Sequence, residues 1–431
     1  MAYGSGMSAT ADRASSATQQ VSYTDLYARW ERGNWSATEL DFSADREQWH
    51  GELSELQRAA ALWNYSLFFH GEDAVADDLA PFIDAAPHEE QKYFLTTQQV
   101  DEARHSVFFG RFMREVVEQG DGTIASALEA TRPQLTWGFV KTFEMLDRVT
   151  GELRTDRSRT ALARAVTLYH IIVEATLAQP GQHFITAYLE DRELLPGFRA
   201  GMRNVALDEQ RHIGFGVKLL HDLAQEDPEV PAAVADMLRE VLPYSLAVFV
   251  PPGWDRAYTE CFGFTLEEIF EEGARSFEAK MRAAALPVGS LPGPQPYPID
   301  LPVADRARRG LRMLQAGLLG EKIGPPGRDP ETMALLFDSM RRAVDHRTAP
   351  AGPFTVQWEF ADAEPWHLRV DNGATAVAPG RAPRVDLEVR CGYETWVDIV
   401  AGRLDPARAL ATGRLRPRGT PLALWRARGI F

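Results

Sequence analysis

Several residue classes are scarce in this 431-residue chain, and each scarcity excludes a class of protein. Only two cysteines are present, Cys261 and Cys391, which are too few and too far apart for a disulfide framework or a thiolate metal site. A reducing cytoplasm is therefore the expected location. The 46 basic residues are outnumbered by 61 acidic ones, a net charge of −15, so nucleic acids and anionic membranes are not expected as partners. Apolar runs such as residues 246–250 are too short to cross a bilayer, and no transmembrane segment is expected.

The pattern of the chain predicts two folded domains of different classes. Residues 1–22 are small and polar, lack the apolar core of a signal peptide and are predicted to form a flexible tail. Residues 23–284 show apolar positions at helical spacing, and residues 285–330 form a linker rich in proline and glycine with one short helix. Residues 331–431 begin with a helix and then alternate apolar and polar positions as strands do, over residues 354–360, 366–370 and 385–389. The predicted fold is thus multidomain, an all-α helical bundle followed by a small α+β domain.

One charged pentapeptide occurs twice, as DEARH at 101–105 and DEQRH at 208–212. On a helix, Glu102 and His105 are three residues apart and share a face, as do Glu209 and His212. A carboxylate and an imidazole placed in this way can bind one metal ion. A single Glu-x-x-His is common on solvated helices, but two copies, each inside an apolar helix, favour a pair of metal-binding helices.

A two-metal site in a helical bundle needs one more carboxylate from each of the two remaining helices. Glu72 follows an apolar run, and Glu174 stands in an otherwise apolar helix. Taken singly, such residues are more often surface or ion-paired groups, but an unpartnered buried carboxylate is costly and a metal cluster removes that cost. The sequence therefore predicts a dimetal site with six ligands: Glu72, Glu102, His105, Glu174, Glu209 and His212.

Asp101 and Asp208 directly precede the paired glutamates. One interpretation makes them ordinary acids of a helix surface. The other places them beside the ligands, where Asp208 would hold the second ring N–H of a ligand histidine, as metal-bound imidazoles usually require. Arg104 and Arg211 would then balance this negative charge.

Residues 50–225 resemble the ferritin-like superfamily, and within it the proteins similar to the small subunit of ribonucleotide reductase. The radical-bearing tyrosine of reductases lies four residues after the first ligand histidine, where this chain has Phe109. The ligand-binding oxidase branch has a valine three residues after the first glutamate and a tyrosine five before the third, which correspond to Val75 and Tyr169. The resemblance implies an ether crosslink between these two side chains, a mixed manganese–iron pair and a long-chain fatty acid near the metals. The alternative is that Val75 and Tyr169 simply pack in the core.

The C-terminal residues, about 331–431, resemble the sterol carrier protein type 2 fold. The resemblance includes the spaced residues Asp405, Ala409, Gly413 and Leu415. It implies an apolar tunnel that either binds lipids or acyl chains or is filled and serves packing or dimer contacts. Four tryptophans are expected in its core or tunnel lining: Trp358, Trp366, Trp396 and Trp425.

Carboxylates and imidazoles suit iron and manganese in redox roles, so the expected cofactor is an Fe/Fe or Mn/Fe pair with O2 as oxidant. The leading interpretation is a dimetal oxidase or monooxygenase that acts on a hydrophobic substrate such as an acyl chain. One alternative is a natural-product N- or C-oxygenase. Another is a lipid-binding protein whose metal centre modifies itself once. An electron-donor protein and a homodimer are left open as partners.

Overall fold

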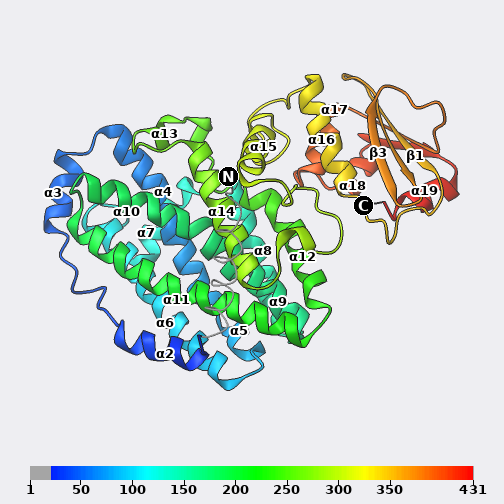
Figure 1. The fold of residues 1–431 in the computed structure, drawn as a ribbon. Helices are drawn as coiled ribbons and strands as arrows, with labels where there is room; N and C mark the ends of the chain where they lie inside the picture. Colours follow the sequence, from blue (N-terminus) through cyan, green and yellow to red (C-terminus); the bar gives the residue numbers. More distant parts are fainter. Residues whose placement is uncertain (1–20, 431) are drawn as a thin grey trace, which may run out of the picture. The chain divides into compact units, whose positions relative to one another are not determined.

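The computed structural model describes residues 21–430. The chain divides into two compact units, Met1–Leu291 and Pro292–Phe431 (Figure 1). The predicted flexible tail, residues 1–22, lies outside the described residues except for its last two, where the Ser22 hydroxyl caps the first helix. The described part of the first unit is helical and the second unit combines a five-stranded sheet with helices. This confirms the predicted all-α bundle followed by a small α+β domain.

The first unit consists of long helices joined by short turns. Their bounds are α2 (Tyr23–Arg32), α3 (Ser43–Gly51), α4 (Glu55–Asp78), α5 (Ala80–Ala85), α6 (Glu89–Glu115), α7 (Ile124–Thr131), η1 (Arg132–Gln134), α8 (Trp137–Leu153), α9 (Arg159–Val166), the π-helical η2 (Thr167–Ala178), α10 (Gln179–Asp191), α11 (Pro196–Glu226), α12 (Val230–Ser245), η3 (Pro252–Trp254), α13 (Ala257–Glu260), α14 (Leu266–Ala283) and η4 (Val288–Ser290).

Local sequence signals set the ends of the helices that form the bundle. The Ser54 hydroxyl accepts a hydrogen bond from the Gln57 backbone N–H, while the Gln57 side chain accepts one from the Ser54 N–H, and α4 begins at this capping box. The turn before α11 contains Leu195 in the left-handed region with φ of 47°, followed by Pro196, whose fixed φ suits the first helical position.

Four helical segments form the centre of the bundle. Helix α4 packs along α6, η2 packs along α11, and contacts between α6 and α11 join the two pairs. Helices α4, α6 and α11 are labelled in Figure 1. The continuous helix Arg159–Asp191, which contains η2, is long and apolar enough by composition to cross a membrane, but 72% of its apolar window is buried inside the unit. Its apolar residues therefore form the bundle core, as expected of a helix surrounded by other helices.

The second unit contains a mixed sheet covered by helices. Its helices are α15 (Val303–Gln315), α16 (Pro330–Arg342), α17 (Tyr393–Val400), α18 (Pro406–Ala411) and α19 (Pro421–Ala427), and its strands are β1 (Phe354–Phe360), β2 (Trp366–Asp371), β3 (Ala374–Pro379), β4 (Leu387–Cys391) and β5 (Leu415–Gly419). The strand order is β3-β2-β1-β4-β5, with β1 and β4 parallel and the other neighbours antiparallel.

Aromatic side chains fill the space between this sheet and α16. The Phe337 ring stacks on Trp366 with centroids 4.7 Å apart and meets Trp358 edge-on at 5.5 Å. Trp396 is half-buried, with its ring 5.3 Å from that of Trp358. The prediction that Trp425 lies in the core or lines a tunnel is wrong, because its side chain is 68% exposed. Helix α19 has only seven residues and contacts the sheet through one face, which leaves Trp425 on the other.

Candidate metal centre

Six buried polar side chains from four helical segments meet inside the first unit. They are the residues that the sequence pattern predicted, and the structure brings all of them together: Glu72 on α4, Glu102 and His105 on α6, Glu174 on η2, and Glu209 and His212 on α11. Each of the six is at most 6% exposed. Charged groups are rarely buried so completely unless they pair with one another or bind a metal.

The six side chains form two overlapping groups of four. The first group is Glu72, Glu102, His105 and Glu209, and the second is Glu102, Glu174, Glu209 and His212. Within each group, one ligand atom per residue lies within 4.8 Å of all the others. Glu102 and Glu209 belong to both groups, so each could bridge two ions. The Nδ1 atom of His105 is 3.1 Å from Glu72 Oε2, and that of His212 is 3.0 Å from Glu102 Oε1.

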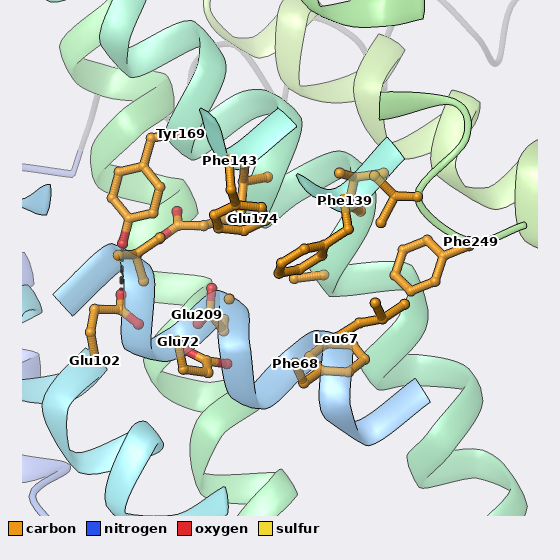
Figure 2. A pocket seen from close by; sticks show the side chains of 16 residues that line it. Leu67, Phe68, Glu72, Glu102, Phe139, Phe143, Tyr169, Glu174, Glu209 and Phe249 are labelled. Atoms are coloured by element: carbon orange, nitrogen blue, oxygen red, sulfur yellow. Dashed lines mark hydrogen bonds between the residues drawn. The ribbon is translucent and has the colours of Figure 1, made fainter. Parts of the chain in front are cut away.

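The π-helical segment and a glycine position the carboxylate of Glu174. Tyr169 and Glu174 are five residues apart in η2, and the wider turn of a π-helix brings both to the same side (Figure 2). Gly216 of α11 faces this segment, and a Cβ there would lie 2.2 Å from the Cβ of His170. Only glycine therefore allows α11 to approach η2 closely enough for Glu174 and His212 to share a cluster.

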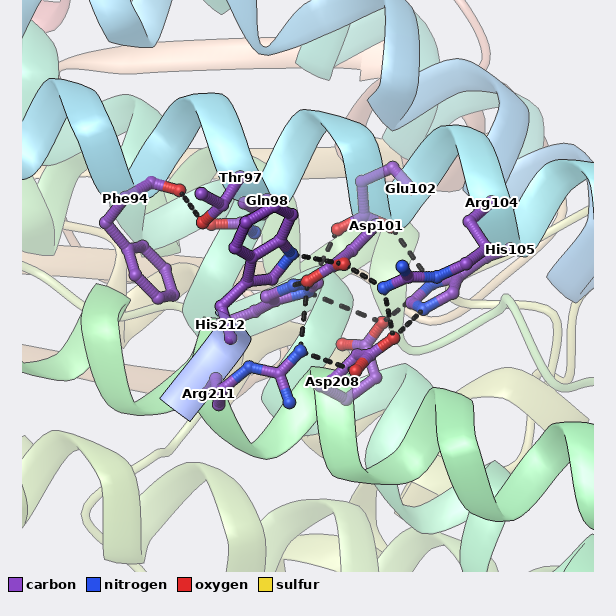
Figure 3. Close-up of polar contacts among 12 residues, drawn as sticks. Phe94, Thr97, Gln98, Asp101, Glu102, Arg104, His105, Asp208, Arg211 and His212 are labelled. Atoms are coloured by element: carbon purple, nitrogen blue, oxygen red, sulfur yellow. Dashed lines mark hydrogen bonds and ion pairs between the residues drawn. The ribbon is translucent and has the colours of Figure 1, made fainter. Parts of the chain in front are cut away.

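Two aspartates orient the histidines in a reciprocal way (Figure 3). The His105 Nε2–H donates to Asp208 Oδ2 at 3.1 Å, and the His212 Nε2–H donates to Asp101 Oδ2 at 3.0 Å. Each aspartate thus holds the histidine of the opposite helix. This bond keeps a proton on each Nε2, so Nδ1, which faces the carboxylates, is the nitrogen that would offer a lone pair to a metal ion.

The charge of the two aspartates is balanced by a ring of donors. Arg104 Nη2 bonds to Asp101 and, at 3.1 Å, to Asp208, while Arg211 Nη2 bonds to Asp208 and, at 3.1 Å, to Asp101. Both arginine side chains are themselves at most 10% exposed. The ring is completed by two indole N–H donors, Trp30 to Asp101 at 2.9 Å and Trp35 to Asp208 at 2.8 Å.

In the metal-free cluster the pKa values of the four carboxyls shift in different directions, and those of both histidines rise. Burial raises the pKa of Glu72 to about 7 and raises those of Glu174 and Glu209 well above their usual range. Burial also opposes ionisation of Glu102, but His212 and His105 outweigh it and hold the pKa of that carboxyl well below its usual range. Burial lowers the pKa of both histidines, yet the surrounding carboxylates outweigh this effect and raise each pKa well above its ordinary value.

These side chains fit a pair of divalent ions. The Oε2 atoms of Glu102, Glu174 and Glu209 are buried without a hydrogen-bond partner among the described residues. An orphaned buried carboxylate oxygen is costly, and a bound cation is the simplest group that would satisfy all three at once. The donor set of four carboxylates and two imidazoles is of the hard to borderline kind that iron and manganese prefer.

A small apolar cavity of about 50 Å³ adjoins the cluster (Figure 2). Glu72, Glu102, Glu174 and Glu209 form its polar end. The remainder is lined by apolar side chains that include Phe68, Phe139, Phe143, Val173, Leu177 and Phe249. Val75 and Tyr169 line the same cavity, and the Tyr169 O–H donates to Glu102 Oε1 at 2.8 Å. A small apolar molecule in this cavity would therefore reach the carboxylates directly.

Several residues at the site were missed by the sequence analysis. Gln98 donates from Nε2 to Glu174 Oε1 at 2.8 Å and to the Tyr169 hydroxyl at 3.0 Å, and its Oε1 accepts from His170 Nε2–H at 3.2 Å. Gln98 lies four residues before Glu102 and therefore on the same face of the helix, so helical spacing could have predicted its place at the site. Trp30 and Trp35 gave no such signal, since they come from α2 and the loop after it, far from the repeated motif.

The pKa directions predict how the stability of the metal-free protein depends on pH. A carboxyl whose folded-state pKa is raised contributes stability at low pH that is lost as the pH rises through the folded-state value. For Glu72 this window runs from 4.5, the ordinary value, to about 7, and the raised values of Glu174 and Glu209 act in the same direction. We expect the free energy of unfolding in chelator to fall over this range. Urea titrations at a series of pH values would measure it, and Glu72→Gln should flatten the dependence.

Comparison with known proteins places the chain in a family. The profile of "Ribonucleotide reductase, small chain" matches residues 17–244, and that of the "SCP-2 sterol transfer family" matches residues 337–424. Among solved structures, two variants of an R2-like ligand-binding oxidase with an anaerobically reconstituted Mn/Fe cofactor are similar. Both are 25% identical to this chain. The first has a TM-score of 0.53, and the match covers 61% of this chain and 93% of the oxidase chain. The second has a TM-score of 0.52, and the match covers 62% of this chain and 94% of the oxidase chain. The small-chain match covers more than half of the sequence, and the protein therefore belongs to the ribonucleotide reductase small chain family and carries a C-terminal SCP-2 domain.

Proposed function

We propose that the protein is an oxygen-activating dimetal oxidase or monooxygenase that acts on a hydrophobic, acyl-chain-like substrate. The observation that carries the proposal is the pair of overlapping donor groups that share Glu102 and Glu209 at the end of an apolar cavity. In this proposal the six buried side chains hold an Fe/Fe or Mn/Fe pair. The similar solved oxidases, which carry a Mn/Fe cofactor, support this choice of metals. When bound, such a pair supplies the electrons and Lewis acidity needed to reduce dioxygen.

A radical-generating subunit of a reductase is a poorer fit to this chain. The position four residues after His105 is Phe109, which is fully buried and stacks on Phe68 with ring centroids 6.1 Å apart. A phenylalanine has no phenolic O–H to lose, so it cannot form the stable tyrosyl radical that a reductase subunit provides. Among the described residues, Tyr169 is the tyrosine whose phenolic O–H donates a hydrogen bond to one of the four carboxylates, that of Glu102.

The lining of the cavity supports a neutral or weakly polar substrate. No lysine, arginine or histidine is among the residues that line it. An anionic group could therefore be neutralised only at the carboxylate end, by the bound ions. The rings of Phe68, Phe139 and Phe249 line the far part of the cavity and would exclude water from the reacting carbon (Figure 2).

We also propose that Val75 and Tyr169 become joined by an ether bond. The new bond links the Tyr169 phenolic oxygen to the Cβ of Val75, and it replaces one O–H and one C–H bond. The two electrons and two protons released go to dioxygen. Glu102 Oε1 already accepts the hydrogen bond of the Tyr169 O–H and is placed to take its proton. Both side chains line the same cavity, which supports the pairing.

The proposal is tested by metal analysis and intact mass on one sample. Full-length protein loaded in air with both Mn(II) and Fe(II) should contain two ions per chain and should lose the mass of two hydrogens. Tyr169→Phe should bind both ions and keep its full mass. Tyr65→Phe, which alters a buried tyrosine that does not line the cavity, should behave as the unaltered protein does.

Repeated turnover separates an enzyme from a protein that modifies itself once. Metal-loaded protein supplied with reductant, oxygen and a fatty acid should consume oxygen in large excess over protein and release an oxidised product. Consumption of a single equivalent would contradict the enzymatic proposal and favour the lipid-binding alternative. An electron-donor protein and a homodimer also stay proposals, and the same assay with candidate reductases addresses the first.

A further inference from the structure

Charge is distributed unevenly between the two units. Residues 1–291 contain 26 basic and 45 acidic residues, a net charge of −19, whereas residues 292–431 contain 20 basic and 16 acidic residues, a net charge of +4. The whole-chain value of −15, from which we expected no anionic partner, therefore conceals a basic second unit.

The positive charge of this unit is concentrated near its C-terminal end. Residues 414–428, which include the edge strand β5 and helix α19, contain five arginines and no acidic residue. We call this segment the arginine–tryptophan surface. None of its five guanidinium groups forms an ion pair with a carboxylate in the part of the chain that the structure describes. Arg416 donates to the Gly413 carbonyl oxygen, Arg414 to the Thr395 hydroxyl, and Arg426 lies over the Phe354 ring.

Large apolar side chains are exposed on the same segment. Leu422 is 64% exposed and Trp425 is 68% exposed, and their spacing of three residues places them on one face of α19. The helix is nevertheless firmly anchored. Ala423 is buried against the sheet, and the carbonyl oxygen of the buried Ile430 accepts a hydrogen bond from the Asp345 N–H at 3.1 Å. The exposure is thus a built feature of α19 and not a consequence of fraying.

We propose that the arginine–tryptophan surface docks on an anionic membrane. Tryptophan and leucine gain free energy by entering the interfacial region of a bilayer, and arginines beside them gain from the negative surface potential and from bonds to lipid phosphates. A nucleic acid would match the arginines but would give the adjacent Leu422 no apolar environment. The inference does not depend on the dimetal chemistry, because it concerns the second unit alone.

Co-sedimentation of the full-length protein with lipid vesicles tests the proposal. We expect binding to mixed phosphatidylcholine and phosphatidylglycerol vesicles, weakening with salt, and little binding to pure phosphatidylcholine. The double variant Arg416→Gln/Arg418→Gln should bind about thirtyfold more weakly, which corresponds to about 1 kcal/mol for each arginine. The double variant Leu422→Ser/Trp425→Ser should lose about tenfold or more. Both sets of side chains are exposed, so neither change should disturb folding.

Matched controls come from the same unit. Arg308, whose side chain is 74% exposed, and Ile323, which is 60% exposed, lie outside the segment. Arg308→Gln and Ile323→Ser should leave vesicle binding unchanged. Absence of binding to anionic vesicles, or equal losses in the control variants, would overturn the proposal. Binding of an oligonucleotide that requires Arg416 and Arg418 but not Leu422 and Trp425 would also overturn it. A third contrary result would be a protein that binds no vesicles and changes its oligomeric state in the Leu422→Ser/Trp425→Ser variant.

Discussion

Glu209→Gln is expected to remove both metal ions from the protein while leaving the metal-free fold intact. Glu209 belongs to both donor groups, so the loss of its negative charge weakens the two sites at once. Glu174 belongs to one group only, and Glu174→Gln is expected to reduce the content from two ions to one. Loss of both ions in Glu209→Gln and of one ion in Glu174→Gln would identify Glu209 as a ligand shared by the two sites. Both carboxyls are buried, and both replacements keep the shape of the side chain.

The metal-free fold should tolerate this change because of the pKa of the carboxyl. Burial and the neighbouring Glu174 and Glu102 raise the pKa of Glu209 well above its usual range, which favours the neutral form of this carboxyl in the apo protein. Glutamine has the same shape as this neutral form. We therefore expect the free energy of unfolding in chelator to change by less than about 1 kcal/mol, as replacements that leave no buried charge unpaired usually do.

Metal analysis and urea unfolding with and without ions would measure these effects. Each ion present at a hundred times its dissociation constant stabilises a protein by about 2.7 kcal/mol, and this gain should vanish for both ions in Glu209→Gln. Glu115→Gln alters an exposed glutamate on α6 and should keep both ions and the full gain. Retention of two ions by Glu209→Gln would show that the residue is no ligand and would remove the basis of the proposed function.

The six residues of the site could be predicted because the periodicity of a helix determines which side chains share one face. The spacing of three between Glu102 and His105 fixes their common face on any regular helix, and the repeat at Glu209 and His212 supplies a second independent copy. Glu72 and Glu174 were readable because an acid inside an apolar helix needs a compensating partner. Such arguments concern single helices, where sequence distance and spatial distance are directly related.

The surroundings of the ligands could not be read in this way. The reciprocal bonds of Asp101 to His212 and of Asp208 to His105 join different helices, and nothing in either pentapeptide states which helix lies opposite. Trp30 reaches Asp101 across 71 residues of sequence, a contact that only the folded chain defines. The π-helical turn at η2 also left no recognisable pattern, because most of its residues are apolar, as in an ordinary core helix.

In the second unit, strands were predictable where apolar and polar residues alternate and not elsewhere. The alternation predicted β1 and β2, and it placed β4 two residues before its observed start at Leu387. Strands β3 and β5 were missed. Strand β3 consists mainly of small residues, and β5 contains Pro417, which argues against a central strand but is acceptable at the edge position that β5 occupies.

Arg211→Met is expected to be among the most destabilising single changes in the chain. The Arg211 side chain is 9% exposed and bonds to Asp101 and Asp208, whose side chains are each 1% exposed. Removing one member of a buried ionic network leaves the opposite charges uncompensated and typically costs about 3–5 kcal/mol. The bonds that hold the two histidines are made by the same aspartates, so the affinity for metal ions should fall as well.

Urea unfolding against a matched pair on the same helix would measure this effect. Arg203 lies two turns before Arg211 and pairs with Glu190 at the surface, where the two side chains are 58% and 47% exposed. Solvent screens such a pair, and Arg203→Met should cost less than about 1 kcal/mol. Asp208→Asn in the Arg211→Met background should recover part of the loss, because it removes one of the charges left unpaired. If Arg211→Met costs no more than Arg203→Met, the buried ring does not stabilise the fold, and the orientation of His105 and His212 must come from helix packing alone.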